Sequence, residues 1–379
     1  MNAFTKEDLK LLQSECFYNK EQRSIAKISE WFAYWNSEVY VAFSGGKDST
    51  VLADLCGYWC SVIDRTLYLA FVNTGLEYPE IQKHVKFFAE YLRQKYKINV
   101  VLDILRPQMR FDEVIKKYGY PMISKEVAKC VSSARRLDSK YGQVCRERLN
   151  GTDKQKSGEV SLFNCEKYKP LLDVDFNISH RCCDVMKKNP SHEYSKRTGR
   201  KPITAQMASE SRLREQQWIK FGCNGFDMAS PTSNPMSFWT EQDVLRYIKE
   251  YDIPIASVYG DIVYKEDPDQ IRLEQVIEKA GLTSEECAKE LSKIGTDELC
   301  TTGCNRTGCI FCGFGCHREQ SPNRFERLKK THPRQYEYCI GGGEYNEEGV
   351  WQPNEKGLGM GHVFDVLNDI YGKDFIRYE

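Results

Sequence analysis

The sequence predicts an α/β fold in which helices flank a parallel sheet, a Rossmann-like arrangement. Short apolar runs suited to buried strands alternate with amphipathic stretches along residues 39–105. The strand runs are almost continuously apolar, as expected when helices cover both faces of a parallel sheet. A glycine turn follows the first run, at the carboxyl end where such sheets bind their ligands. These observations indicate a ligand-binding α/β protein.

The expected elements alternate regularly between strand and helix. The expected strands cover 39–43, 67–72 and 99–105, and the expected helices cover 48–59 and 81–96. Later in the chain, 240–250 reads as an amphipathic helix that Thr240 caps. The alternation of strand and helix is the pattern of βαβ units, which form parallel sheets.

We divide the 379 residues into four segments. An N-terminal helical segment, 1–37, precedes the nucleotide-binding domain, 38–262. A helical insertion, 263–299, then leads to a cysteine-rich C-terminal region, 300–379. Chains of this length usually hold one large domain or a few ordinary ones.

The composition argues against two classes of protein, those that coat nucleic acid and those that span a membrane. Lysine and arginine number 54, as do aspartate and glutamate, so the chain lacks the net charge of a protein that coats nucleic acid. No apolar run is long enough to span a membrane and the first residues lack a signal sequence, so we expect a cytoplasmic protein without membrane contact.

One segment is locally basic: residues 125–156 hold nine basic and four acidic side chains. They form either a solvated helix and loop or a docking surface for a phosphate-rich partner.

The turn after the first strand has the composition of a phosphate-binding loop. It reads Ser44-Gly45-Gly46-Lys47-Asp48-Ser49 and leads into an expected helix. Glycines let backbone N–H groups approach an anion, and the helix N-terminus adds its dipole. Lys47 supplies a positive charge. The spacing differs from that of a Walker A loop.

Sixteen cysteines are unusual for a chain without an export signal. Clustered thiols in a reducing compartment indicate metal or redox chemistry. Cys182 and Cys183 are adjacent, and five more cysteines lie between 300 and 316. Within that stretch, a local tetrathiolate site for Zn²⁺ or an Fe–S cluster is one interpretation. Its ligands would be Cys304, Cys309, Cys312 and Cys316.

Several of these segments resemble a known family. The loop 44–49 resembles the pyrophosphate loop of the adenine nucleotide alpha-hydrolase-like (PP-loop) superfamily, and further segments resemble its phosphoadenosine phosphosulfate (PAPS) reductase family. The further segments are 71–80 with its Asn-Thr-Gly, 180–188 with its paired cysteines, 205–214, 235–259, and 308–312 with its Cys-x-x-Cys. The resemblance therefore extends over residues 39 to 316.

The resemblance implies a set of site residues. The loop from Ser44 to Ser49 would grip the phosphates of ATP or of a sulfonucleotide (APS or PAPS), and Asn73, Thr74 and Gly75 would border the nucleotide. Lys47, Asp48 and Arg214 would act on the reacting groups, with Asp48 facing Mg²⁺. Arg214 would either neutralise sulfate or phosphate or form a surface ion pair. In the iron–sulfur branch of the family, a [4Fe–4S] cluster would be held by Cys182, Cys183, Cys309 and Cys312.

Three functions remain open. The first is adenylation of an acceptor with pyrophosphate release, in a sulfur-transfer reaction with a nucleic-acid acceptor and a sulfur-donor protein. The second is reduction of APS or PAPS to sulfite with a thioredoxin-like reductant. The family's C-terminal nucleophilic thiol is absent here, so Cys339 would have to act in its place. In the segment 205–214, Ala205 and Met207 stand where the family has glycine and arginine. The third is a nucleotide-binding Fe–S protein without catalysis.

Overall fold

The computed structural model describes residues 4–136, 139–155, 157–265 and 298–379. Contacts divide the chain into two compact units, each built from discontinuous segments. We name the first the sheet unit: Met1–Phe71, Tyr78–Ile104 and Tyr194–Thr307. We name the second the thiol unit: Val72–Glu77, Leu105–Glu193 and Gly308–Glu379.

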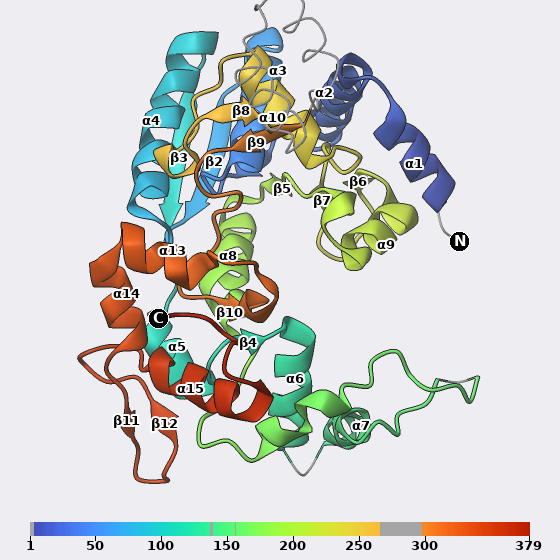
Figure 1. The fold of residues 1–379 in the computed structure, drawn as a ribbon. Helices are drawn as coiled ribbons and strands as arrows, with labels where there is room; N and C mark the ends of the chain where they lie inside the picture. Colours follow the sequence, from blue (N-terminus) through green and yellow to red (C-terminus); the bar gives the residue numbers. More distant parts are fainter. Residues whose placement is uncertain (1–3, 137–138, 156, 266–297) are drawn as a thin grey trace, which may run out of the picture. The chain divides into compact units, whose positions relative to one another are not determined.

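The sheet unit carries the predicted α/β core. Its sheet has six strands in the order β3-β2-β1-β5-β7-β6 (Figure 1). Strand β1 pairs in parallel with β2 on one side and with β5 on the other, β7 pairs in parallel with β5, and only β6 runs antiparallel to its neighbour among the pairs described. The strands are β1 Val39–Ala42, β2 Leu67–Val72, β3 Val100–Leu105, β5 Lys201–Ile203, β6 Asn224–Gly225 and β7 Thr232–Ser233. The fold class expected from the sequence is confirmed.

The order of the strands has a direct consequence for ligand binding. From β1 the chain proceeds outward to β2 and β3, and it later returns to the other side of β1 through β5. The loop after β1 therefore lies at the point where the direction of winding reverses. In open α/β sheets this switch point is where ligands bind, outside the carboxyl ends of the strands.

Helices of the sheet unit pack around one buried helix, α3. Almost every turn of α3 is buried, and it packs against α2, α4 and α10. The helices are α1 Lys6–Ser14, α2 Phe17–Tyr34, α3 Lys47–Val62, α4 Pro79–Tyr96, α8 Asn189–Thr198 (which begins in the thiol unit), α9 Arg212–Phe221 and α10 Glu241–Glu250. The N-terminal helical segment is thus two helices, and Thr240 caps α10 through a reciprocal capping box with Asp243, as predicted.

The expected insertion, 263–299, lies largely outside the described residues. Its described ends are extended, because β8 (Ile262–Tyr264) pairs antiparallel with β9 (Leu299–Thr301). The backbone N–H of Lys265 donates to the carbonyl of Glu298 at 2.7 Å. The two ends of the segment therefore meet, as an insertion into a continuous domain requires.

The thiol unit combines helices with two small sheets. Strand β4 (Met122–Ile123) pairs in parallel with β10 (Gly313–Phe314), which joins the cysteine-rich region to the middle of the chain. Strands β11 (Glu344–Tyr345) and β12 (Trp351–Gln352) form an antiparallel hairpin. The helices are α5 Phe111–Tyr118, α6 Lys125–Ala134, α7 Lys140–Leu149, α13 Arg324–Thr331, α14 Pro333–Ile340 and α15 Met360–Tyr371. Within the described residues, no helix is long and apolar enough to cross a membrane.

Candidate functional site

The loop after β1 is shaped by its two glycines. Gly45 has a φ of +74°, and a Cβ atom there would lie 2.7 Å from the Val85 side chain and 2.9 Å from that of Ile81. Only glycine fits this left-handed, crowded position. Gly46 then caps α3, which begins at Lys47. The loop is therefore held against α4 and leads into a helix N-terminus, where backbone N–H groups attract anions.

The loop is closed by its own hydroxyl groups. The Oγ atoms of Ser44 and Ser49 lie 3.0 Å apart, and the Ser44 Oγ also accepts from the Gly46 N–H at 3.3 Å. The Ser49 hydroxyl donates to the Gly46 carbonyl at 2.9 Å. The structure thus brings the six predicted phosphate-contact residues into one ordered turn, and such a turn loses little conformational entropy when an anion binds.

Lys47 is buried and surrounded by partners that are distant in sequence. Its Nζ donates to the Asn305 carbonyl at 3.0 Å and pairs with Glu241 at 3.0 Å. Its backbone N–H donates to the Tyr259 hydroxyl at 3.2 Å, and that hydroxyl lies 2.6 Å from Thr307 Oγ1. The sequence did not assign these four residues to the site, because each lies about 200 residues or more from the loop and none belongs to a recognisable phosphate-binding pattern.

Asp48 lies beside Lys47, whose Nζ is 3.6 Å from the Asp48 Oδ1. Its Oδ1 is buried and has no hydrogen-bond partner among the residues the structure describes. Burial raises the pKa of this carboxyl, while Lys47 and Arg306 act in the opposite direction. A buried carboxylate oxygen whose ion-pair partner is this distant can accept a further positive charge, and a divalent cation would supply one.

Arg214 lies near the loop and is already paired. It forms an ion pair with Glu210, which Arg306 also approaches at 3.6 Å. Burial and Arg306 lower the pKa of Arg214, and Asp48 raises it. Arg214 thus has an acidic partner in this structure, and its electrostatic interaction with Asp48 connects it to the phosphate loop.

Asn73, Thr74 and Gly75 belong to the thiol unit, where they form a compact turn. The Gly75 N–H donates to Asn73 Oδ1 at 3.0 Å, and Thr74 donates to Glu77 through its N–H at 3.0 Å and its hydroxyl at 2.7 Å. The carbonyl of Leu76 accepts from the N–H of Ile310 at 2.8 Å. The turn is thereby attached to the Cys309-x-x-Cys312 segment.

The four thiols expected in the family pattern occur in the same unit. The Sγ atoms of Cys182 and Cys183 are 4.0 Å apart, and the pair directly precedes a turn of π-helix, Asp184–Lys188. Hydrogen bonding to Cys183 and burial raise the pKa of Cys182, and the thiols of Cys309 and Cys312 contribute to the same shift. All four thiols therefore interact electrostatically.

Positive side chains surround these thiols. The hydrogen bond with Cys182 lowers the pKa of Cys183, and Lys125 and Lys187 lower it further. Burial raises the pKa of Cys309 to about 11, against the opposing charge of Lys187. Lys187 was not assigned a role from the sequence. Burial alone would lower its pKa, but Cys309 and Glu77 raise it, so this lysine couples the turn at Thr74 to the thiols.

The cysteines of the alternative local set are divided between the two compact units. Cys304 belongs to the sheet unit, whereas Cys309, Cys312 and Cys316 belong to the thiol unit. The Cys316 thiol donates to the Gly313 carbonyl at 3.0 Å, and burial raises its pKa to about 12. Within the described ranges, no three Cys, His, Asp or Glu side chains are close enough together to bind a single metal ion.

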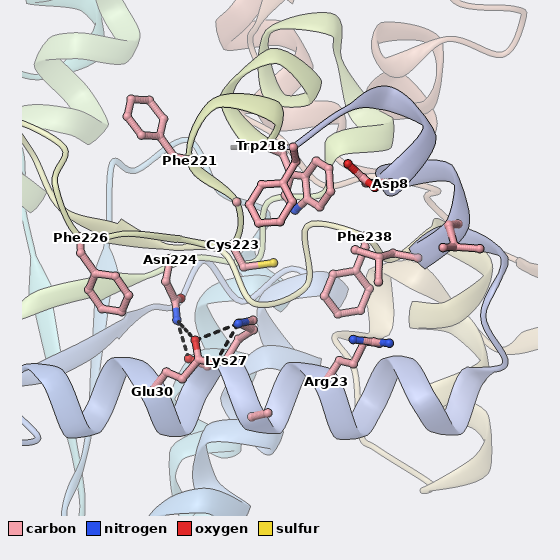
Figure 2. A pocket seen from close by; sticks show the side chains of 15 residues that line it. Asp8, Arg23, Lys27, Glu30, Trp218, Phe221, Cys223, Asn224, Phe226 and Phe238 are labelled. Carbon is pink, nitrogen blue, oxygen red and sulfur yellow. Dashed lines mark hydrogen bonds and ion pairs between the residues drawn. The ribbon is translucent and has the colours of Figure 1, made fainter. Parts of the chain in front are cut away.

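A separate cavity of about 600 Å³ lies between α1, α2 and α9 in the sheet unit. Figure 2 shows its aromatic lining, with Lys27, Glu30 and Asn224 joined by polar contacts along one side. Its aromatic side chains are Phe4, Trp218, Phe221, Phe226 and Phe238. None of the site residues predicted from the sequence lines this cavity.

Comparison with known proteins agrees with the arrangement of these segments. A family model described as the phosphoadenosine phosphosulfate reductase domain matches residues 38–145 and 137–314. An uncharacterized protein of Methanocaldococcus jannaschii is 34% identical over 103 residues, which are 27% of this chain and 19% of that protein. The chain therefore aligns with about a fifth of this relative. The family match covers most of the chain and includes both the phosphate loop and the two pairs of cysteines, so the protein belongs to the phosphoadenosine phosphosulfate reductase family of the PP-loop superfamily.

Proposed function

We propose that this protein is an enzyme that binds ATP and Mg²⁺ at the loop 44–49 and adenylates an acceptor with release of pyrophosphate. The observation that carries the proposal is the ordered loop at the switch point of the sheet, with Gly45 in a position that excludes side chains. Backbone N–H groups and Lys47 would stabilise the charge that develops on the phosphates. The Oδ1 of Asp48, which lies 3.6 Å from the Lys47 Nζ and has no hydrogen bond, would bind the cation.

We further propose that Cys182, Cys183, Cys309 and Cys312 hold a [4Fe–4S] cluster. Four thiolates are the ligands such a cluster needs, and these four thiols interact electrostatically within one unit. Lys125, Lys187 and Arg324 would offset its negative charge. When bound, the cluster would supply iron that can bind sulfur or transfer electrons. The residues of the chain would hold it and, through Lys187 and Glu77, connect it to the turn at Thr74.

Adenylation is favoured over reduction of a sulfonucleotide by the surroundings of Cys339. This thiol is fully buried, and burial raises its pKa well above the usual range. Its sulfur lies 3.4 Å from the sulfur of Met360. A nucleophilic cysteine needs access and a stabilised thiolate, and Cys339 has neither. Reduction with a thioredoxin-like reductant remains the second candidate, because the family match itself supports a sulfonucleotide.

The acceptor we propose is a nucleic acid, with a sulfur-donor protein as the source of sulfur. The support is the basic segment 125–156, whose described residues include α6 and α7. Several of its arginines bind the protein itself: Arg135 donates to the carbonyls of Leu171 and Val174, and Arg148 pairs with Asp153. Contacts with phosphates would therefore be made mainly by the lysines of this segment.

The decisive experiment compares two products on anaerobically purified full-length protein. Pyrophosphate release from ATP and sulfite release from APS or PAPS are measured in parallel, together with ATP binding by calorimetry. Lys47→Met should weaken ATP binding at least about tenfold, because a buried cation that contacts the phosphates is lost. Lys95→Met removes another paired lysine of the same unit, one that binds Asp54, and should leave ATP binding unchanged.

Each outcome distinguishes the candidates. Pyrophosphate release that Lys47→Met abolishes supports adenylation. Sulfite release without pyrophosphate would replace adenylation with the reductase. Nucleotide binding without either product would leave the non-catalytic nucleotide-binding Fe–S protein.

A further inference from the structure

A second group of thiols lies in the thiol unit, outside the proposed cluster site. Cys130 is on α6, Cys145 is on α7, and Cys165 directly precedes a short 3₁₀ helix, Glu166–Leu172. The Sγ atoms of Cys130 and Cys165 lie 3.8 Å apart, in contact. The thiol of Cys130 also donates to the carbonyl of Cys145 at 3.4 Å. Neither the phosphate loop nor the cluster site uses these residues.

The backbone holds this contact in place. Cys130 and Cys165 are separated by 35 positions in the sequence, so their proximity is a product of the fold. The N–H of Cys165 donates to the carbonyl of Arg148, the penultimate residue of α7, at 2.9 Å. Helix α7 packs closely against α6. Because the two sulfurs already touch, rotations of the side chains can bring them to the roughly 2 Å of a disulfide bond.

The two thiols differ in access. Cys130 is buried, with 2% of its surface exposed, whereas Cys165 is only half-buried. The side chains just before Cys165 are strongly exposed, Leu162 at 88% and Phe163 at 58%. A reagent in solution can therefore reach Cys165 and not Cys130.

The pKa shifts of the two thiols also favour a first reaction at Cys165. The hydrogen bond with Cys130 and the charge of Arg148 lower the pKa of Cys165. The same hydrogen bond and burial raise the pKa of Cys130. The half-buried sulfur is thus the better nucleophile for the first attack, and the buried sulfur, already in contact with it, is placed to resolve the mixed disulfide.

From this geometry we propose that Cys130 and Cys165 form a reversible dithiol–disulfide pair that exchanges with small-molecule disulfides such as glutathione disulfide. The Cys165 thiolate attacks one sulfur of glutathione disulfide, forms a mixed disulfide and releases one glutathione thiolate. The Cys130 sulfur, giving up its proton, attacks the Cys165 sulfur and releases the second glutathione. Two protein thiols are oxidised, and one glutathione disulfide is reduced to two glutathione molecules, which take up the two protons.

The pair encloses most of the basic segment. A bond between residues 130 and 165 would cross-link α6 to the chain that follows α7. Such a bond constrains the unfolded chain over the enclosed residues and stabilises their folded arrangement. The redox state of this pair would therefore determine how firmly the proposed nucleic-acid-binding segment is held.

The test is peptide mapping after anaerobic oxidation. Full-length holoprotein is incubated with glutathione disulfide, free thiols are alkylated under denaturing conditions, and the protein is digested with trypsin. The sequence predicts separate peptides for the two cysteines, 130–135 and 157–167. We expect them to be recovered joined through one disulfide, and to separate after treatment with dithiothreitol.

Variants give the matched controls. Cys165→Ser should abolish the joined peptides, and Cys130→Ser should leave Cys165 as a stable glutathione adduct. Cys145→Ala removes the third thiol of the group, and the joined peptides should persist. The proposal is overturned if unmodified protein yields no joined peptide, if Cys165 stops at the glutathione adduct, or if Cys145→Ala prevents the bond while the variant melts like the unmodified protein.

Discussion

At the scale of single residues, the phosphate loop depends on a position that only glycine can occupy. Gly45 combines a positive φ with two neighbouring side chains closer than any real Cβ contact. Alanine there would have to adopt the left-handed conformation and displace Val85 and Ile81 of α4. The loop shape and the packing of α4 are therefore coupled through one residue.

We expect Gly45→Ala to lower the free energy of unfolding by roughly 2–4 kcal/mol, the sum of left-handed strain and overpacking. Denaturation with urea measures this change. Gly199→Ala is the matched control, because Gly199 has a φ of +76° with no atom within 4 Å of its Cβ position. Gly199→Ala should lower the free energy of unfolding by only about 1 kcal/mol, because it adds backbone strain without overpacking. Equal losses in the two variants would show that the α4 side chains do not restrict the loop.

Residues of the site differ in how far the sequence could predict them. The loop 44–49 was predictable because its residues are consecutive and follow a recognisable strand. Glu241 and Tyr259, which surround Lys47, come from distant segments, and only the folded chain brings them to the loop. Lys187 is similar: it follows the paired cysteines, yet its link to Glu77 exists only in three dimensions.

At the scale of elements, α3 and α4 meet through a buried histidine. His84 of α4 is 5% exposed, and its Nε2 lies 3.1 Å from the hydroxyl of Thr50 on α3. Burial lowers the pKa of His84 from 6.5 to about 4. The folded protein therefore keeps this imidazole neutral over a pH range in which the unfolded chain protonates it.

The free energy of unfolding should therefore fall as the pH is lowered. Since the folded pKa is below the unfolded value, the contribution of His84 is complete above pH 6.5 and is lost as the pH falls towards 4. The free energy of unfolding should decrease by up to about 1.4 kcal/mol per pH unit in this window, or about 3 kcal/mol in total. His84→Gln removes the titration and keeps a polar partner for Thr50. Urea denaturation across the window should show a shallower slope for the variant, and identical slopes would contradict the assignment.

Elements were predictable where a local pattern determines them. The apolar runs at β1, β2 and β3 and the cap at Thr240 are local signals, and each produced the expected strand or helix. Strands β6 and β7 have two residues each and were missed, because a pair of residues shows no periodicity. The π-helical turn after Cys183 was also unpredictable, since no residue type specifies it.

At the scale of the whole molecule, the two compact units do not follow the four sequence segments, because each unit is assembled from separated stretches. The sequence shows no boundary at Val72 or Gly308, where the chain passes between units. As a result, Cys304 and Cys309 are only a few positions apart in the sequence and belong to different units. The proposed shared cluster uses only thiols of the thiol unit, whereas the local set includes Cys304 of the sheet unit.

We expect anaerobically purified protein to contain iron and acid-labile sulfide, and substitutions in the two cysteine pairs to remove both. Cys182→Ala and Cys309→Ala should each lose most of the iron, because each removes one of the four ligands of a shared cluster. Cys304→Ala and Cys316→Ala should retain the iron, because the shared cluster uses neither residue.

The local tetrathiolate site predicts a different pattern. Cys304→Ala and Cys316→Ala would then lose the metal and Cys182→Ala would retain it, whereas Cys309→Ala would lose it in either case. Zinc is measured alongside iron, since a local site could select it. Thermal melting identifies any variant that loses metal only because it unfolds. Iron that survives in a folded Cys182→Ala variant, and disappears in Cys304→Ala, would replace the shared cluster with the local one.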